Sequence, residues 1–264
     1  MSAPEQQLPS AGWYVDPQDE LGQRYWDGAR WTEDRRKEQA ESLERLARWV
    51  LWSLALAVVA LAALFAFVIP HLINVNEALD GQLSPAELAE SRDRTDTAGL
   101  IVDLVGVVPA LLLFLVWNYR SYRNLPRLGA TGLKHRSWAV VPYWFIPVVS
   151  LLLPKHVMND VWRASDPELP VAQGAKWKDR AIPAVLGWWW GFVVAYQLAT
   201  GRSFSLDVTG NGLEDERNEM IFSIAYAALG IVAFGLTAIV VQRVTERQEQ
   251  RRQLFTTGDF PVAR

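Results

Sequence analysis

The chain has no cysteine among its 264 residues. Disulfide bonds, thiolate nucleophiles and cysteine-ligated zinc or iron–sulfur clusters are therefore excluded. Residues 1–10 contain no apolar run, so we predict a disordered tail and no cleavable signal peptide. Charged residues are also almost absent from five apolar stretches. Their interiors contain no Lys or Arg, and of the 29 Asp and Glu residues only Asp103 lies within an apolar stretch. This segregation predicts an all-α polytopic membrane protein.

The five apolar stretches differ in their capacity to cross a bilayer. They comprise residues 47–69, 97–117, 138–154, 181–200 and 220–241. Four of them reach the roughly 20 residues that a spanning helix needs. The third is shorter and contains Pro142 and Pro147, each of which removes a backbone hydrogen bond that lipid cannot replace. We therefore predict a membrane domain at 47–242 with four transmembrane helices and a proline-broken segment that re-enters the membrane or lies in its interface.

The basic residues predict the orientation of these spans. With four spans, 22 Lys and Arg lie on the side of both termini and 4 lie on the other side. If residues 138–154 also crossed, the two sides would carry 14 and 12. Basic loops are retained in the cytoplasm, which favours four spans in the cell membrane. Both termini are then cytoplasmic, including a tail at residues 243–264.

Residues 11–32 contain a dense group of aromatic side chains. Asp27-Gly28 is a two-residue turn signal between aromatic runs, so we predict a small β-hairpin module. Aromatic surfaces of this kind bind extended or proline-rich peptides. We therefore assign the binding of a cytoplasmic protein or peptide partner to the exposed aromatic and proline residues Trp13, Tyr14, Pro17, Tyr25, Trp26 and Trp31.

Residues 33–46 are rich in charge and carry acid-before-base pairs four residues apart, Glu33 and Lys37 among them. Such pairs stabilise exposed helices. We predict a charged cytoplasmic helix that leads into the first span and ends with it at Pro70.

Two parts of the chain resemble uncharacterised families. The stretches G-W-Y-x-D-P and R-Y-W-D-G-x-x-W-T resemble a short Trp-rich module found at the N-terminus of many membrane proteins of high-GC Gram-positive bacteria, although Val15 stands where that family usually has proline. Within residues 98–245, the stretches W-x-Y-R, F-I-P, W-R-A-S-D-P and W-W resemble a membrane domain that often follows this module. The resemblance implies location and architecture, and it implies no activity.

Asp103 is the one acidic residue within a predicted span. Gly99, Gly106 and Ala110 recur at three- and four-residue intervals around it, which predicts a small-residue face where helices pack and places Asp103 toward the bundle. Acidic residues in this setting usually serve as proton or cation sites. The alternative is that Asp103, about 9 Å inside the outer end of its span, only contacts interfacial water.

A basic run without any acid follows the second span. Because the cytoplasmic leaflet is anionic, we assign lipid headgroup binding to its members Arg120, Arg123, Arg127, Lys134 and Arg136. A specific phosphorylated ligand is the alternative. Binding of nucleic acid is not expected, because no folded basic domain surrounds the run.

The sequence contains no recognisable catalytic or cofactor motif, so we expect no enzymatic activity and no cofactor. His156 and Asp160 stand four residues apart without a third ligand nearby. The loop that begins at Asp207 resembles a calcium loop, but Asn218 occupies the position where a bidentate Glu is required. We therefore expect no bound metal.

Two functions remain open. The leading interpretation is a non-enzymatic membrane adaptor or scaffold that presents the Trp-rich module to a cytoplasmic partner. The alternative is a small transporter or channel that uses Asp103 and the proline-broken segment, since irregular membrane segments tend to line cavities. Four spans are few for transport, so this alternative implies a homo-oligomer.

Overall fold

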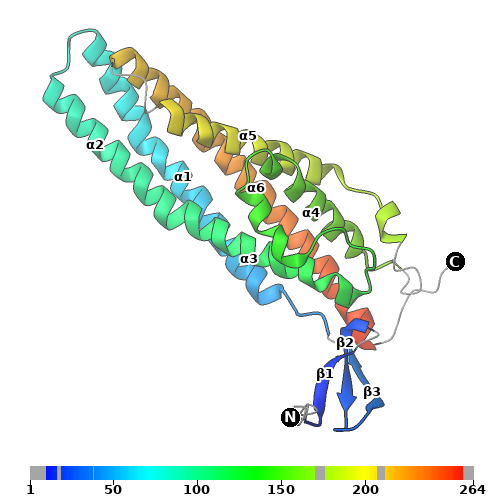
Figure 1. Ribbon diagram of the computed structural model, residues 1–264. Helices are drawn as coiled ribbons and strands as arrows, with labels where there is room; N and C mark the ends of the chain where they lie inside the picture. The colour runs from blue at the N-terminus through cyan, green and yellow to red at the C-terminus, as the bar shows by residue number, and fades with distance from the viewer. Residues whose placement is uncertain (1–9, 17–18, 38, 170–175, 207–211, 258–264) are drawn as a thin grey trace.

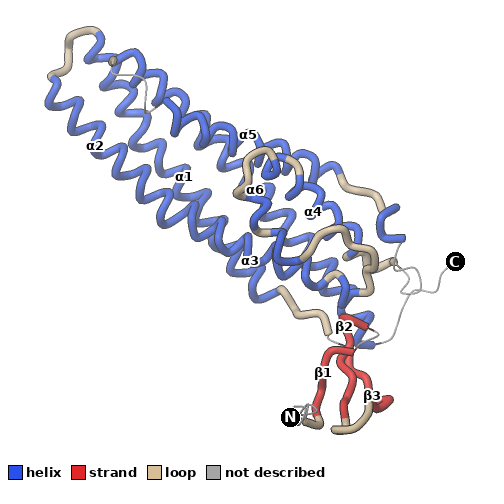
Figure 2. Tube along the Cα trace, viewed as in Figure 1, coloured by secondary structure: helices blue, strands red, loops and turns tan. Residues whose placement is uncertain are grey.

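The computed structural model describes residues 10–16, 19–37, 39–169, 176–206 and 212–257. These residues form a long helical bundle with a small β-sheet at one end (Figures 1 and 2). We call the end of the bundle that carries the sheet the sheet end, and the opposite end the far end. The predicted tail at residues 1–10 lies almost entirely outside the described residues, as do the last residues of the predicted C-terminal tail.

The N-terminal module is a three-stranded antiparallel sheet. Its strands are β1 (Gly12–Asp16), β2 (Asp19–Trp26) and β3 (Trp31–Lys37), in the order β1-β2-β3. The predicted hairpin turn is a four-residue loop, because the ladder closes at the Trp26–Trp31 pair. Asp27 holds this loop by accepting hydrogen bonds from the amides of Ala29 and Arg30, both at 2.8 Å. These backbone hydrogen bonds lower the pKa of Asp27.

The charged helix predicted for residues 33–46 is wrong in its first part. Residues up to Lys37 belong to β3, and the helix begins only at Glu44. Arg24 explains the difference: its Nε donates to the carbonyl of Thr32 at 2.6 Å, and its Nη2 lies 3.2 Å from Glu33 Oε1. They accompany the backbone ladder between β2 and β3, which pairs Arg24 with Arg35 and Gly22 with Lys37, whereas the pair of Glu33 and Lys37 offers a helix only a few tenths of a kcal/mol.

Helix α1 (Glu44–Leu79) does not end at Pro70 but continues for more than two turns beyond it. His71, which is fully buried, explains why: its Nδ1 lies 3.0 Å from Ser91 Oγ and its Nε2 lies 2.9 Å from Glu216 Oε1. These contacts attach the outer part of α1 to two neighbouring helices. They offset the single hydrogen bond that Pro70 removes.

The second predicted span lies within one continuous helical rod. The rod consists of α2 (Pro85–Ile101), the π-helix η1 (Val102–Val107) and α3 (Val108–Asn124). A capping box starts it: the Glu87 amide donates to Ser84 Oγ at 3.3 Å, and the Ser84 amide donates to Glu87 Oε2 at 3.1 Å. The Ser84 hydroxyl also donates to Glu87 Oε2 at 2.6 Å, and this bond together with that from the Ser84 amide lowers the pKa of Glu87.

The residues predicted as a proline-broken segment form no continuous helix. They contain the short 3₁₀ helices η3 (Ser137–Val140), η4 (Pro142–Trp144) and η5 (Val149–Leu151), followed by α4 (Leu153–Ala164). The two parts of this segment meet at an angle of 101°. Val148 at the bend has φ +66°, a strained conformation for a β-branched residue.

Two more helices complete the bundle: α5 (Ala184–Leu206) and α6 (Leu213–Thr257). Helix α6 packs along both α1 and α5 (Figure 1). Where the three helices meet, Gly230 leaves so little room that a Cβ atom would lie 2.8 Å from both Leu61 Cδ1 and Tyr196 Cε2. The fully buried side chains of α1, α3, α4 and α6 form the main core toward the sheet end.

Three of the helical stretches are long and apolar enough to cross a membrane: α1, the rod from Pro85 to Asn124, and α6. The bent pair Ser137–Trp144 and Val149–Ala164 adds a fourth candidate if both halves form one span. The length and composition of these helices are those of a membrane protein.

Candidate functional site

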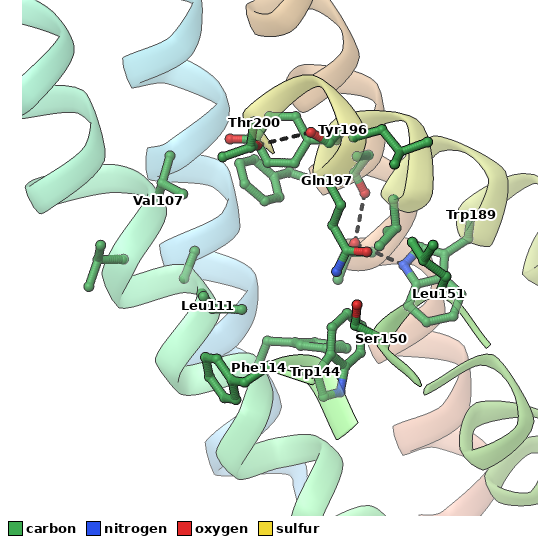
Figure 3. Close-up of a pocket in the computed structure, with 18 of the residues that line it drawn as sticks. Val107, Leu111, Phe114, Trp144, Ser150, Leu151, Trp189, Tyr196, Gln197 and Thr200 are labelled. Carbon is green, nitrogen blue, oxygen red and sulfur yellow. Dashed lines mark hydrogen bonds between the residues drawn. The ribbon is translucent and has the colours of Figure 1, made fainter. Parts of the chain in front are cut away.

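A cavity of about 760 Å³ opens between α3 and α5. Figure 3 shows its two long walls: Val107, Leu111 and Phe114 come from the rod, and Trp189 and Tyr196 come from α5. Leu54 of α1 and the α6 residues Ala233, Phe234 and Thr237 also line it. The proline-broken segment closes its sheet end through Trp144, Phe145, Pro147, Val148, Ser150 and Leu151. The lining is predominantly apolar, as in most small-molecule sites.

Polar groups gather toward the far end of the cavity. Asp103, Tyr196, Thr200 and Tyr226 line it there. The hydroxyls of Tyr196 and Tyr226 lie 2.6 Å apart, and their rings stack with centroids 4.7 Å apart. Tyr226 also makes a side-chain hydrogen bond with Thr200, and the carboxylate of Asp103 interacts electrostatically with both tyrosines. The cavity is therefore largely apolar, with its one carboxylic acid at the far end and the polar side chains of Gln197, Thr237 and Ser150 elsewhere in the lining.

The π-helix determines where Asp103 lies. C-terminal to Asp103, the predicted small-residue face packs inside the bundle. Ala110 is buried, and a Cβ at Gly106 would lie 3.1 Å from Ala60 Cβ of α1. Asp103 does not share that face, because it is exposed at the protein surface and lines the cavity. The wider turn of η1 rotates the residues before it relative to those after it. Single π turns within α-helices are frequent at functional sites.

An aromatic group separates the cavity from the sheet end. The Trp144 ring contacts Phe114 edge-on at 5.3 Å and Trp190 at 6.0 Å between centroids. Trp189, which is fully buried, donates through Nε1 to Thr237 Oγ1 at 3.0 Å. The proline-broken segment is thereby packed against both α3 and α5.

Of the six aromatic and proline residues assigned to partner binding, the structure brings three together. Tyr14 and Trp26 contact Trp31 edge-on, with ring centroids 6.3 and 5.3 Å away. Tyr25 precedes Trp26 in β2, so its side chain points to the opposite face of the sheet. Pro17 and the side chain of Trp13 lie outside the described residues.

The predicted lipid-binding residues lie at the sheet end of the bundle. Arg120, Arg123, Lys134 and Arg136 are exposed, whereas Arg127 is half-buried. The nearby Trp138 is 65% exposed. Exposed basic residues beside an exposed Trp form the kind of surface that contacts the headgroup region of a bilayer.

Sequence reasoning missed a polar cluster at the sheet end. Arg251, which is 1% exposed, donates to the backbone carbonyls of Leu128, Asp166 and Leu169 at 2.7 to 2.8 Å. The Asp166 carboxylate also pairs with Arg180 at 3.1 Å and with Arg247 at 3.3 Å. Asp166 belongs to the W-R-A-S-D-P stretch. That motif therefore joins α4 to α6, and its role in the described structure is to hold the bundle together.

A second cluster that the sequence did not indicate lies at the far end. Besides His71, Glu216 accepts a bidentate pair of hydrogen bonds from Arg92, with the Nε donor at 2.7 Å. Burial opposes ionisation of Glu216, but the hydrogen bonds and charges of Arg92 and His71 lower its pKa. The partners are up to 145 residues apart in the sequence, so no local pattern could reveal them. Within the described part of the chain, no three His, Asp or Glu residues gather as metal ligands.

Three helical stretches, or four with the bent pair, are long and apolar enough to cross a membrane, which fits a membrane protein. The chain belongs to the family described as a domain of unknown function, DUF4328, whose model matches residues 80–246. Residues 11–43 match a second family model, the protein of unknown function DUF2510. No curated protein and no solved structure matches the chain. Helix α1 lies outside both matched ranges although its Leu54 lines the cavity.

Proposed function

We propose that the protein binds a small molecule in the cavity between α3 and α5 and belongs to the ligand-binding or transport proteins of the membrane. One observation carries the proposal: the cavity brings together Asp103 and the proline-broken segment, the two features on which the transporter alternative rested. Irregular backbone is tolerated at membrane depth where it lines a cavity or is buried in protein. The proposal is one of binding and passage, without a catalytic reaction.

The proposed orientation places the sheet end in the cytoplasm. Four spans then cross the membrane, namely α1, the α2–α3 rod, α5 and α6, and the proline-broken segment turns back. The 22 basic residues on the side of the termini, against 4 on the other, support this topology. Asp103 then lies toward the outer leaflet, and the exposed arginines at the sheet end contact the anionic headgroups of the inner leaflet.

Two neighbouring leucines give a direct test of the cavity. Leu111 lines it, whereas Leu112 is 57% exposed outside it. We expect the full-length protein to bind the neutral probe naphthylmethanol saturably in equilibrium dialysis. Leu111→Trp fills the cavity and should abolish this binding, while Leu112→Trp should preserve it. Equal binding by both variants would refute the cavity as a ligand site.

A second candidate function is the presentation of the sheet to a cytoplasmic partner. The specific observation is the cluster of Tyr14, Trp26 and Trp31 on a sheet that projects from the end of the bundle (Figure 1). Aromatic-lined surfaces bind proline-rich segments. We expect a fluorescent polyproline peptide to bind the full-length protein, and Trp31→Ala to weaken this binding while Trp138→Ala does not. Unchanged binding by Trp31→Ala would remove the support for an adaptor.

A further inference from the structure

The hydroxyl groups at the polar end of the cavity satisfy one another. Thr200 Oγ1 donates to the carbonyl of Tyr196 at 2.9 Å. The Tyr226 hydroxyl bonds to Thr200, and the Tyr196 hydroxyl bonds to Tyr226. The Thr200 hydroxyl is committed to the Tyr196 carbonyl, and either hydroxyl of the Tyr196–Tyr226 pair can be its donor. In the described part of the structure, none of these three hydroxyls donates a hydrogen bond to the Asp103 carboxylate.

The charge of the cavity is also one-sided. Among the described residues that line it there is no Lys, Arg or His, and Asp103 is the one carboxylic acid. No described residue donates a hydrogen bond or an ion pair to the Asp103 carboxylate. A carboxylate without a partner favours an occupant that brings positive charge and hydrogen-bond donors.

The remaining walls define the body of the occupant. Leu111, Phe114 and Val107 on one side face Trp189 on the other across a space that Gln197 and Ser150 also line (Figure 3). Near the polar end, Tyr196 stacks on Tyr226 and contacts Phe234 edge-on at 5.5 Å. Aromatic faces attract cations as well as apolar groups. An anionic lipid is disfavoured, because its headgroup would meet Asp103 without a neutralising base.

We infer that the ligand of this cavity is a hydrophobic ammonium ion, with its charged nitrogen at Asp103 and its apolar body between α3 and α5. The inference rests on the proposed function, because it names the chemical class of molecule that the cavity takes. It specifies that the ligand is positively charged and how the ligand is oriented in the cavity. The ammonium group points to the far end, and the apolar group points to Trp144.

Three probes that share one ring system and differ in charge test the inference. They are naphthylmethylammonium, the neutral naphthylmethanol and the anionic naphthoate, each measured by equilibrium dialysis against the full-length protein at neutral pH. We expect the ammonium probe to bind about tenfold more tightly than the alcohol, and naphthoate to bind most weakly. Asp103→Asn should lower the affinity for the ammonium probe about tenfold and leave the alcohol unaffected.

Asp93→Asn is the matched control, since Asp93 is an exposed carboxylate of α2 that does not line the cavity. This variant should keep the preference for the cation. If all three probes bind the wild type equally and Asp103→Asn changes none of them, the inference is overturned while the binding cavity stands. If no probe binds the wild type, or if Leu111→Trp leaves all binding intact, the proposed function fails as well.

Discussion

The replacement of Gly230 by Ala tests the packing on which the cavity depends. A Cβ atom at this position would lie 2.8 Å from Leu61 Cδ1 and from Tyr196 Cε2. Carbon atoms pack at about 3.5–4.0 Å, so both neighbours would have to retreat by about 1 Å. Leu61 is fully buried, and Tyr196 is held by its hydroxyl contact and ring stack with Tyr226. Neither side chain can move without losing contacts.

The expected magnitude follows from two opposing effects. Overpacking of a core costs about 1–3 kcal/mol, whereas Ala in place of Gly within a helix returns up to about 1 kcal/mol. We therefore expect Gly230→Ala to lower the free energy of unfolding by about 1–2 kcal/mol. For a chain of this size, that corresponds to a Tm lower by about 2–8 °C.

Gly235 offers a control on the same helix, because a Cβ atom there would meet no other atom within 4 Å. Gly235→Ala should keep the gain in helix propensity without the clash, so its Tm should equal or exceed that of the wild type. The assay is thermal unfolding of both variants in one detergent, followed by near-ultraviolet circular dichroism. A Gly230→Ala protein that unfolds at or above the wild-type temperature would refute the close packing of α1, α5 and α6.

Three further predictions concern the ends of the bundle. Arg251→Met leaves three buried carbonyls without their donor, so it should lower the free energy of unfolding by about 3–5 kcal/mol, measured by thermal unfolding. Arg92 stabilises the ionised form of Glu216 in the folded protein, so the folded-state pKa of Glu216 lies below its unfolded-state pKa. The contribution of Glu216 to stability is therefore complete above the unfolded-state pKa, and it is lost as the pH falls through the folded-state pKa. A pH titration of the Tm should therefore show a loss at acid pH in the wild type that Glu216→Gln lacks. A single cysteine at Gln82 should react with an impermeant maleimide added outside intact cells, whereas one at Thr131 should not; the reverse result would contradict the proposed orientation.

The apolar helices could be predicted from sequence because length and composition are local properties. The predicted spans 47–69, 97–117 and 220–241 lie within α1, the α2–α3 rod and α6, and the span 181–200 lies in α5 except for its first three residues. The ends of these elements were less predictable, because contacts with distant residues decide them. Pro70 predicts the end of the first helix, but His71 contacts α6, and the helix continues beyond the proline. Glu33 is predicted as helical, but the backbone pairing of β3 with β2 places it in a strand.

The candidate site was predictable only in part. Asp103 and the proline-broken segment stand out in the sequence because charge and proline are rare within apolar stretches. That they line one cavity could not be predicted, since the lining combines residues from Leu54 to Thr237. The orientation of Asp103 depends on the π-helix η1, and a single extra residue in a helical turn leaves no recognisable pattern in the sequence.

The presence of the cavity follows from the chemistry of the proline-broken segment. Pro142 and Pro147 prevent residues 138–154 from forming the continuous helix that could pass between α3 and α5 and fill the space. The segment instead turns through 101° and packs through Trp144 against Phe114 and Trp190, so it closes only one end. The strained backbone of Val148 lies at this turn and lines the cavity. Backbone strain persists where the surrounding packing holds it and is concentrated at functional sites, which is a further reason to place the function of this chain in the cavity.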